Sequence, residues 1–284
     1  MVRKTTKFFL GVLIFIAFVV WSAVLRAPDQ GLKVTVFDVG QGDAILIKSA
    51  EDKNILIDGG PDNQFLSALG DELPYFNHQI EAIILTHPHA DHLFGLIEIL
   101  KRYQVKKIYL TGVVHTSSLY LEFLNLIKEK NIETEVLIRG DELNFGDLRL
   151  VALWPERDLT GESVDDLNST SIVLKLSSAE FQALLLADID RESQQVMLNR
   201  GDFNDFSDID LLKIAHHGSG ENYNQNLIDK VRPKQAIISV GEDNRYGHPA
   251  KSVVDDLLRR EIELFRTDRD GSVSFTTNGA SLSR

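Results

Sequence analysis

The 284-residue sequence contains no cysteine, two methionines, two tryptophans and seven prolines. The absence of cysteine excludes disulfides, thiolate nucleophiles and cysteine-type zinc sites. Positive charge is also scarce, because 30 Lys and Arg residues stand against 42 Asp and Glu residues, which gives a net charge of −12. An acidic chain does not attract polyanions as a whole. A nucleic-acid partner would therefore need bound cations or a local basic patch.

One long apolar run is present, at residues 8–25, and it contains no charged residue. Its 18 residues are near the minimum length for a helix that spans a bilayer. Arg3, Lys4 and Lys7 precede the run, and by the positive-inside rule they place the N-terminus in the cytoplasm. We therefore expect a single-pass anchor in the cytoplasmic membrane, with the rest of the chain outside. A cleaved signal peptide with secretion is the main alternative.

The remainder of the chain is expected to form one domain over residues 32–284, behind an anchor and linker at residues 1–31. Apolar, β-branched runs predict strands at 32–37, 44–48, 54–57, 82–86, 107–111, 135–138, 148–153, 171–176, 182–187, 209–215, 235–240 and 272–276. Helical patterns lie at 92–103, 117–130, 190–200, 224–231 and 251–260. Paired strands followed by alternating strands and helices predict a layered α/β domain with mixed sheets.

The densest chemistry lies in the segment His87-Pro88-His89-Ala90-Asp91-His92, which holds three of the eight histidines. Residues i and i+2 of an extended segment point the same way, so His87 and His89 share a face. Asp91 and His92 open the next expected helix and offer a second group of ligands. Imidazole and carboxylate suit zinc, manganese or iron. The alternative is a surface loop that binds nothing, which so local a concentration of histidine disfavours.

Further polar residues follow other expected strands. Asp58 could orient a ligand histidine from behind, or simply stabilise a turn. Asp188 ends an apolar run, where its carboxylate could bridge two metal ions. His216 and His217 end another run, and adjacent strand residues face opposite sides, so we expect one of the two to be a ligand. His248 lies in a turn before a helix, where it is either a helix-entry residue or a catalytic group.

Together these motifs resemble the metallo-β-lactamase superfamily and, within it, the C-terminal hydrolase domain of the ComEC competence proteins. The matching stretches are 38–44, 56–60, 85–92, 168–174, 216–219 and 246–249. The resemblance covers residues 32–276. It implies an αββα sandwich that binds one or two divalent ions, zinc or manganese. It also implies a hydrolase, with a phosphodiester such as nucleic acid as the first choice of substrate.

The resemblance also implies roles for individual residues. The expected ligands are His87 and His89 for metal one, Asp91, His92 and one of His216 and His217 for metal two, and Asp188 as the bridge. Asp91 is counted among the catalytic residues as well. His248 and Ser219 are expected to contact the substrate phosphate or to protonate the leaving group. Asp43, Asp58 and Asn168 are expected around the metal ions or the substrate.

Two departures from the family pattern matter. Asn168 lies where a third histidine of metal one is expected in the superfamily, so that site could be incomplete, weak or selective for manganese. The ComEC proteins also carry many membrane helices, whereas this chain has one candidate, which cannot form a DNA channel. Two other functions stay open. One is hydrolysis of another ester, such as a phosphorylcholine ester or a lactone, and the other is a metal-stabilised binding module with little turnover.

Overall fold

The structure is a computed structural model that describes residues 2–24, 31–73, 79–179, 181–277 and 282–283. The chain divides into two compact units, residues 1–30 and 31–284. The first unit contains helix α1 (Val2–Val24), at the position of the expected apolar helix. Within the described residues, no helix meets the length and apolarity that a membrane crossing requires. The predicted membrane span is therefore not confirmed.

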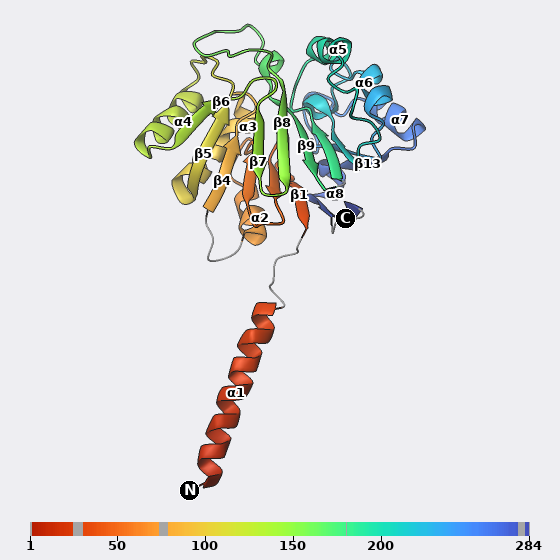
Figure 1. Cartoon of the computed structure of the whole chain (residues 1–284). Coiled ribbons are helices and arrows are strands. Elements are labelled where there is room, and N and C mark those ends of the chain that lie inside the picture. The colour runs from red at the N-terminus through yellow and green to blue at the C-terminus, as the bar shows by residue number, and fades with distance from the viewer. Residues whose placement is uncertain (1, 25–30, 74–78, 180, 278–281, 284) are drawn as a thin grey trace. The chain divides into compact units, whose positions relative to one another are not determined.

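Two mixed sheets form the second unit (Figure 1). Among the described residues, the first sheet has the strand order β15-β14-β1-β2-β3-β4-β5-β6, and the second has the order β13-β12-β11-β10-β9-β8-β7. Strands β3 to β6 run parallel, as do β10 to β13, while the other neighbours are antiparallel. The strands are β1 (Leu32–Val36), β2 (Ile45–Lys48), β3 (Asn54–Ile57), β4 (Gln79–Ile84), β5 (Gln104–Leu110), β6 (Glu133–Val136), β7 (Glu142–Phe145), β8 (Leu148–Trp154), β9 (Val173–Ser178), β10 (Phe181–Leu185), β11 (Leu211–Lys213), β12 (Gln235–Ile238), β13 (Glu263–Arg266), β14 (Val273–Thr277) and β15 (Leu282–Ser283).

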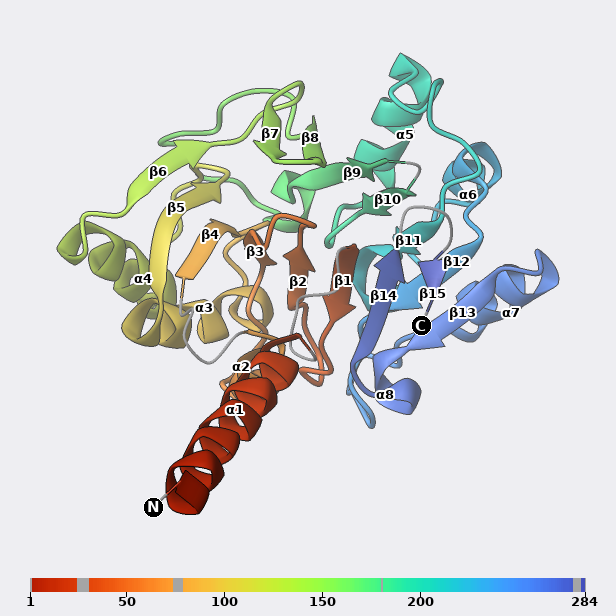
Figure 2. The ribbon, with the colours of Figure 1, turned by 60° about the horizontal axis from the view of Figure 1, so that its bottom comes forward.

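Helices cover the outer faces of both sheets (Figure 2). The α-helices of this unit are α2 (Phe65–Glu72), α3 (Ala90–Arg102), α4 (Ser118–Glu129), α5 (Arg191–Arg200), α6 (Gln225–Val231), α7 (Lys251–Arg259) and α8 (Thr267–Asp270). Two short 3-10 turns, η1 (Asn168–Thr170) and η2 (Ala215–Gly218), also carry predicted site residues. Figure 2 shows α3 and α4 beside β4–β6, and α6 and α7 beside β11–β13.

Alternation along the strands explains the layers. Ile57 of β3 and Leu185 of β10 point into the apolar core between the two sheets. Their neighbours point the opposite way, because successive strand residues face opposite sides. Leu56 joins the cluster that packs under α2, α3 and α4, and Leu184 joins the cluster under α5, α6 and α7. The order of layers is therefore helix, sheet, sheet, helix, which confirms the αββα sandwich expected from the resemblance.

Some elements differ from the sequence-based expectations. Strands β7, β13 and β15 and helices α2 and α8 were not predicted, because each is short, and β7 and β13 contain charged or amide residues as well as apolar ones. The strand expected over residues 209–215 is correct only for its centre. Strand β11 ends at Lys213, and the chain then turns through η2.

Candidate metal centre

The predicted site residues gather where several strands end. The segment with His87 to His92 follows β4, Asp188 follows β10, and His217 follows β11. Each of these strands has a parallel neighbour in its sheet. Parallel strands bring their carboxyl ends to one edge, where loops can present side chains from distant parts of the sequence. This geometry positions residues from both sheets around one centre.

The start of helix α3 sets the positions of two of these residues. His89 is the N-cap, and Asp91 and His92 lie in the first turn. A carboxylate in the first turn is favoured by the positive end of the helix dipole. Gly95 lets the helix approach the turn after β3, since a Cβ atom there would lie 1.9 Å from the carbonyl oxygen of Gly59. The close approach brings His92 beside Asp58.

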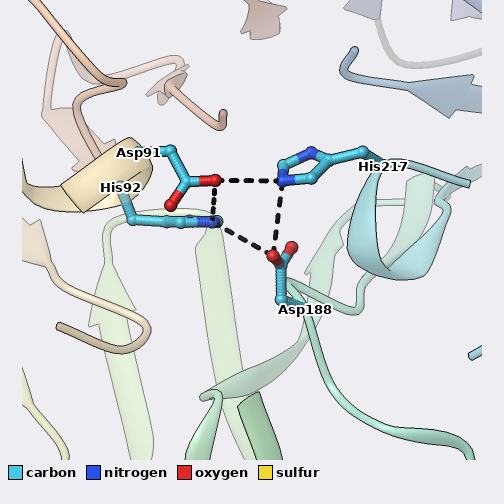
Figure 3. A group of neighbouring side chains, drawn as sticks. All are labelled: Asp91, His92, Asp188 and His217. Atoms are coloured by element: carbon cyan, nitrogen blue, oxygen red, sulfur yellow. Dashed lines mark hydrogen bonds and ion pairs between the residues drawn. The ribbon is translucent and has the colours of Figure 1, made fainter. Parts of the chain in front are cut away.

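Asp91, His92, Asp188 and His217 form a compact group of ligand atoms (Figure 3). One ligand atom from each residue lies within 4.8 Å of all the others. Asp188 Oδ2 lies 3.3 Å from His92 Nε2 and 3.3 Å from His217 Nε2. Asp91 Oδ2 lies 3.5 Å from His217 Nε2 and 3.9 Å from His92 Nε2. Figure 3 shows the four side chains pointing toward one another from separate parts of the chain.

Both histidines of this group are held in position by a hydrogen-bond acceptor at Nδ1, the ring nitrogen that points away from the centre of the group. His92 Nδ1 lies 2.8 Å from Asp58 Oδ2, and His217 Nδ1 lies 2.9 Å from the carbonyl oxygen of Ser239. Both partners accept hydrogen bonds, so each Nδ1 carries the proton and donates it. When such a ring is neutral, its lone pair lies on Nε2, toward the centre of the group. This carboxylate or carbonyl support is typical of histidines that bind metal ions.

Asp58 is itself held rigidly. Its Oδ1 accepts a hydrogen bond from the backbone N–H of Thr86 at 2.8 Å, and its Oδ2 accepts one from the Thr86 hydroxyl at 2.7 Å. Burial raises the pKa of the Asp58 carboxyl, although its contact with His92 opposes that shift. The side chain is 1% exposed. Asp58 therefore lies where the sequence predicted a residue that orients a ligand histidine.

The donor set fits a divalent cation. Among the described residues, the buried atoms Asp188 Oδ1 and His217 Nε2 have no hydrogen-bond partner. Two carboxylates also face each other within this group, an arrangement that a shared cation would stabilise. Two imidazoles and two carboxylates form a mixed nitrogen and oxygen set, which suits a divalent metal ion.

The charges within the group show how strongly the carboxylates act on the histidines. Burial by itself would lower the pKa of His217, but Asp188 and Asp91 raise it to about 10. The pKa of His92 also lies well above its usual value, because Asp188, Asp58 and Asp91 outweigh the effect of burial. Burial would raise the pKa of Asp188, but His217 and His92 hold it well below its usual range. Without a cation, these carboxylates favour the charged form of both rings.

The residues expected at metal one are arranged differently. His87 is fully buried and its Nε2 lies 2.9 Å from His89 Nδ1, so the two rings contact each other. Burial lowers the pKa of both rings. Neither ring belongs to a close metal-ligand group within the described residues. Asn168 lies in η1 with its buried Oδ1 unpartnered there. Their role as ligands of a metal ion stays a prediction.

His216, His248 and Ser219 lie beside the group. His216 Nε2 is 3.9 Å from Asp188 Oδ2, its side chain is 28% exposed, and its Nδ1 contacts the Asn222 side chain. The ring centroid of His248 lies 5.9 Å from that of His216. Ser219 is buried, and its backbone N–H donates to the His216 carbonyl at 2.9 Å. Burial lowers the pKa of both His216 and His248.

The conformation of the paired histidines corrects one step of the sequence argument. His216 and His217 are not consecutive strand residues, because both lie in η2 with positive φ angles of 48° and 52°. Left-handed backbone is uncommon for residues other than glycine and often marks a functional site. The turn directs His217 into the ligand group and leaves His216 half-buried at its edge. We expected one ring of the pair to be a ligand and the other not, and this geometry agrees with that expectation. The reason given for it, alternation of side chains along a strand, was wrong.

Sequence reasoning missed Lys213, whose side chain is fully buried beneath the centre. Its ammonium group forms an ion pair with Asp43, donates to the Ala187 carbonyl at 3.0 Å and lies 3.8 Å from Asp188 Oδ1. Burial would lower the pKa of Lys213, but Asp43 and Asp188 raise it above its usual value. Asp43 Oδ1 also lies 3.6 Å from His217 Nδ1. Lys213 thus neutralises carboxylates that the centre keeps away from water.

Comparison with known proteins agrees with this fold. The chain is 29% identical over 262 residues to ComE operon protein 3 of Bacillus subtilis (strain 168), covering 86% of this chain and 33% of that protein. It is 26% identical over 252 residues to competence protein ComA of Neisseria gonorrhoeae, covering 87% of this chain and 33% of that protein. The chain thus spans about a third of the length of these relatives, and they confirm the resemblance to the competence proteins.

A solved structure shows the same fold. The metallo-β-lactamase fold protein YhfI from Bacillus subtilis matches with a TM-score of 0.56 and 16% identity, covering 87% of this chain and 100% of that one. Residues 37–242 match the family model described as "Metallo-beta-lactamase superfamily". This chain belongs to the metallo-β-lactamase superfamily.

Proposed function

We propose that this protein is a metal-dependent hydrolase of phosphodiesters, with nucleic acid as its substrate class. The observation that carries the proposal is the group of Asp91, His92, Asp188 and His217, in which both histidines are already oriented to bind a cation. A divalent ion held by this group would supply Lewis acidity, lower the pKa of a bound water and offset the negative charge of a phosphate. No nucleophilic side chain is then needed.

The residues of the chain have separate roles in this proposal. Asp58 and the Ser239 carbonyl hold His92 and His217 in the tautomer that binds a cation. Lys213 balances charge beneath the centre. His216 is the half-buried ring next to Asp188. Burial lowers its pKa and so favours the neutral ring, which can donate a hydrogen bond to a phosphate oxygen without bringing a positive charge close to the cation.

The choice of nucleic acid rests on the relatives and on charge. Competence is the state in which bacteria take up DNA, and the name of one relative, competence protein ComA, refers to it. A cation at the centre would also locally offset the repulsion between a chain of net charge −12 and a polyanion. Since the chain spans about a third of those relatives, DNA transport is not part of this proposal. Hydrolysis of another ester and metal-stabilised binding are the competing functions.

The test is hydrolysis of a labelled single-stranded oligonucleotide, a duplex and a small phosphodiester by metal-stripped protein, before and after zinc or manganese is added. We expect turnover only with metal. His92→Ala should reduce turnover to background, whereas the matched control His115→Ala, which changes a histidine outside the ligand group, should not. Tight metal binding without turnover on any phosphodiester would favour the binding module, and turnover on a phosphorylcholine ester or a lactone alone would favour the other hydrolase.

We also propose that the domain acts outside the cytoplasmic membrane. Only the N-terminal segment supports this location, through the apolar run 8–25 and the basic residues Arg3, Lys4 and Lys7. Protease added to cells with a permeabilised outer layer should digest residues 32–284. Protection of this region until the cells are lysed would contradict the proposed location.

A further inference from the structure

A row of aromatic rings leads from the ligand group to the surface. The centroids of His217 and His216, of His216 and His248, and of His248 and Tyr246 are each 5.9 Å apart. The last two rings are stacked, with 20° between their planes. His217 is 2% exposed, whereas Tyr246 is 55% exposed. The row therefore connects a buried metal-ligand histidine to a tyrosine that is open to solvent.

The position of Tyr246 is fixed by the loop that carries it. The Asn244 side-chain amide donates to the carbonyl oxygens of Gly241 at 2.9 Å and His248 at 2.6 Å. The Asn244 side-chain oxygen accepts from the backbone N–H groups of Tyr246 at 3.2 Å and His248 at 3.0 Å. One asparagine thus ties the loop together, and a ligand that stacks on Tyr246 would lose little free energy in ordering it.

Arg245 adds a cation at the same place. Its guanidinium group lies 5.0 Å from the centroid of the Tyr246 ring and donates to the phenol oxygen at 2.9 Å. Across the described part of the chain, no carboxylate forms an ion pair with Arg245, whereas Arg149, for example, is paired with Glu142. In so acidic a protein, this arginine remains available to an anionic group of a ligand.

We propose that Arg245, Tyr246 and His248 form a seat for one base and an adjacent phosphate of a single-stranded nucleic acid. Bases stack on aromatic rings and on guanidinium planes whatever their sequence, and arginine pairs with backbone phosphates. A duplex hides the faces of its bases, so the seat selects single strands. The inference deepens the proposed function, on which it rests for the chemistry at the metal centre, by naming the form of the substrate.

Binding without added metal tests the seat apart from hydrolysis. The probes are a fluorescein-labelled oligodeoxythymidylate and a strand of the same length made only of abasic deoxyribose units, measured by fluorescence anisotropy. We expect the unchanged protein to bind the base-bearing strand about 5- to 150-fold more tightly, the range for one stacked base. Tyr246→Leu should lose that preference, whereas Tyr246→Phe, which keeps the ring, should retain it. A parallel measurement with a labelled oligouridylate tests whether the seat prefers DNA or RNA.

Arg245→Gln tests the phosphate contact separately. It should reduce the slope of log K against log salt concentration by about 0.7, the value for one phosphate contact on a single strand. Three results would overturn the seat. They are equal affinity of the unchanged protein for both strands, no binding of either strand by the unchanged protein, and an unchanged preference for the base-bearing strand in Tyr246→Leu. If the binding measurements support the seat but metal-loaded protein hydrolyses no phosphodiester, only the proposed function is refuted. If metal-loaded protein hydrolyses a phosphodiester but binds the base-bearing and abasic strands equally well, only the seat is refuted.

Discussion

Asp58→Asn removes the charge that orients His92 while keeping the shape of the side chain. In the structure, Asp58 accepts three hydrogen bonds, two from Thr86 and one from His92. Asparagine has one acceptor oxygen and one NH₂ group, so it cannot accept at both ends of the amide. Whichever way it lies, at least one of the present donors loses its acceptor.

The two orientations set the size of the effect. If the oxygen of the new amide faces His92, its NH₂ group meets the Thr86 N–H, and an unsatisfied buried donor costs about 1–3 kcal/mol. If the NH₂ group faces His92 Nδ1, the ring must carry its proton on Nε2, the atom that should bind the cation. Only this second orientation acts on metal binding, because the first costs the protein the same with and without metal. A cost of about 1–3 kcal/mol for returning the proton to Nδ1 corresponds to about 5- to 150-fold in affinity. This range agrees with the about 10- to 100-fold loss that follows removal of such supporting carboxylates.

The assay is a titration of metal-stripped protein with zinc or manganese against a chromophoric chelator. Asp58→Asn should weaken metal binding by about 10- to 100-fold. The matched control is Asp62→Asn, which changes a carboxylate in an exposed turn that accepts from the Gln64 N–H at 2.8 Å, and it should leave the affinity unchanged. Circular dichroism checks that both variants are folded. A folded Asp58→Asn protein with the affinity of the unchanged protein would refute the role given to Asp58.

Three further outcomes are expected. In the metal-free protein, the pKa of His217 is raised to about 10, above the ordinary value of 6.5. The charged form of His217 therefore stabilises that protein fully below pH 6.5, and this stability is lost as the pH rises toward 10. A metal ion must displace the same proton, so metal affinity should increase with pH over this window, and calorimetry that shows no proton release would contradict this. Lys213→Met leaves the buried carboxylates of Asp43 and Asp188 without their positively charged partner. It should lower the free energy of unfolding, measured by urea titration, by about 3–5 kcal/mol. Unchanged stability would contradict the role of Lys213. Asn168→His should tighten the weaker of two metal sites, and an unchanged titration would show that Asn168 does not stand in for a missing ligand.

Local patterns in the sequence predicted much of the fold and of the candidate site. The apolar stripe of residues 92–103 predicted helix α3, and its start carries Asp91 and His92 as expected. The run that ends in Asp188 predicted strand β10 and a carboxylate just beyond it. These predictions succeeded because periodicity and the order of residues at a strand end are short-range properties.

The parts that could not be predicted depend on tertiary contacts or on backbone geometry. The acceptor for His217 is the backbone oxygen of Ser239, and no sequence pattern identifies a carbonyl. The left-handed turn at His216 and His217 overrides the strand that the preceding apolar residues favour. Lys213 did leave a signal, a single charge inside the run Leu211-Leu212-Lys213-Ile214, but its partner Asp43 lies in another part of the chain.

Hydrolysis by the metal-stripped protein tests the central claim most directly. Cleavage of a labelled single-stranded oligonucleotide would be followed as zinc or manganese is added back to the unchanged protein and to Asp188→Asn, whose side chain is placed between His92 and His217. We expect no cleavage without metal, restored cleavage with about one or two metal ions per chain in the unchanged protein, and none in the variant. Cleavage that persists without metal, or that is the same in Asp188→Asn, would contradict a metal-dependent phosphodiesterase at this centre.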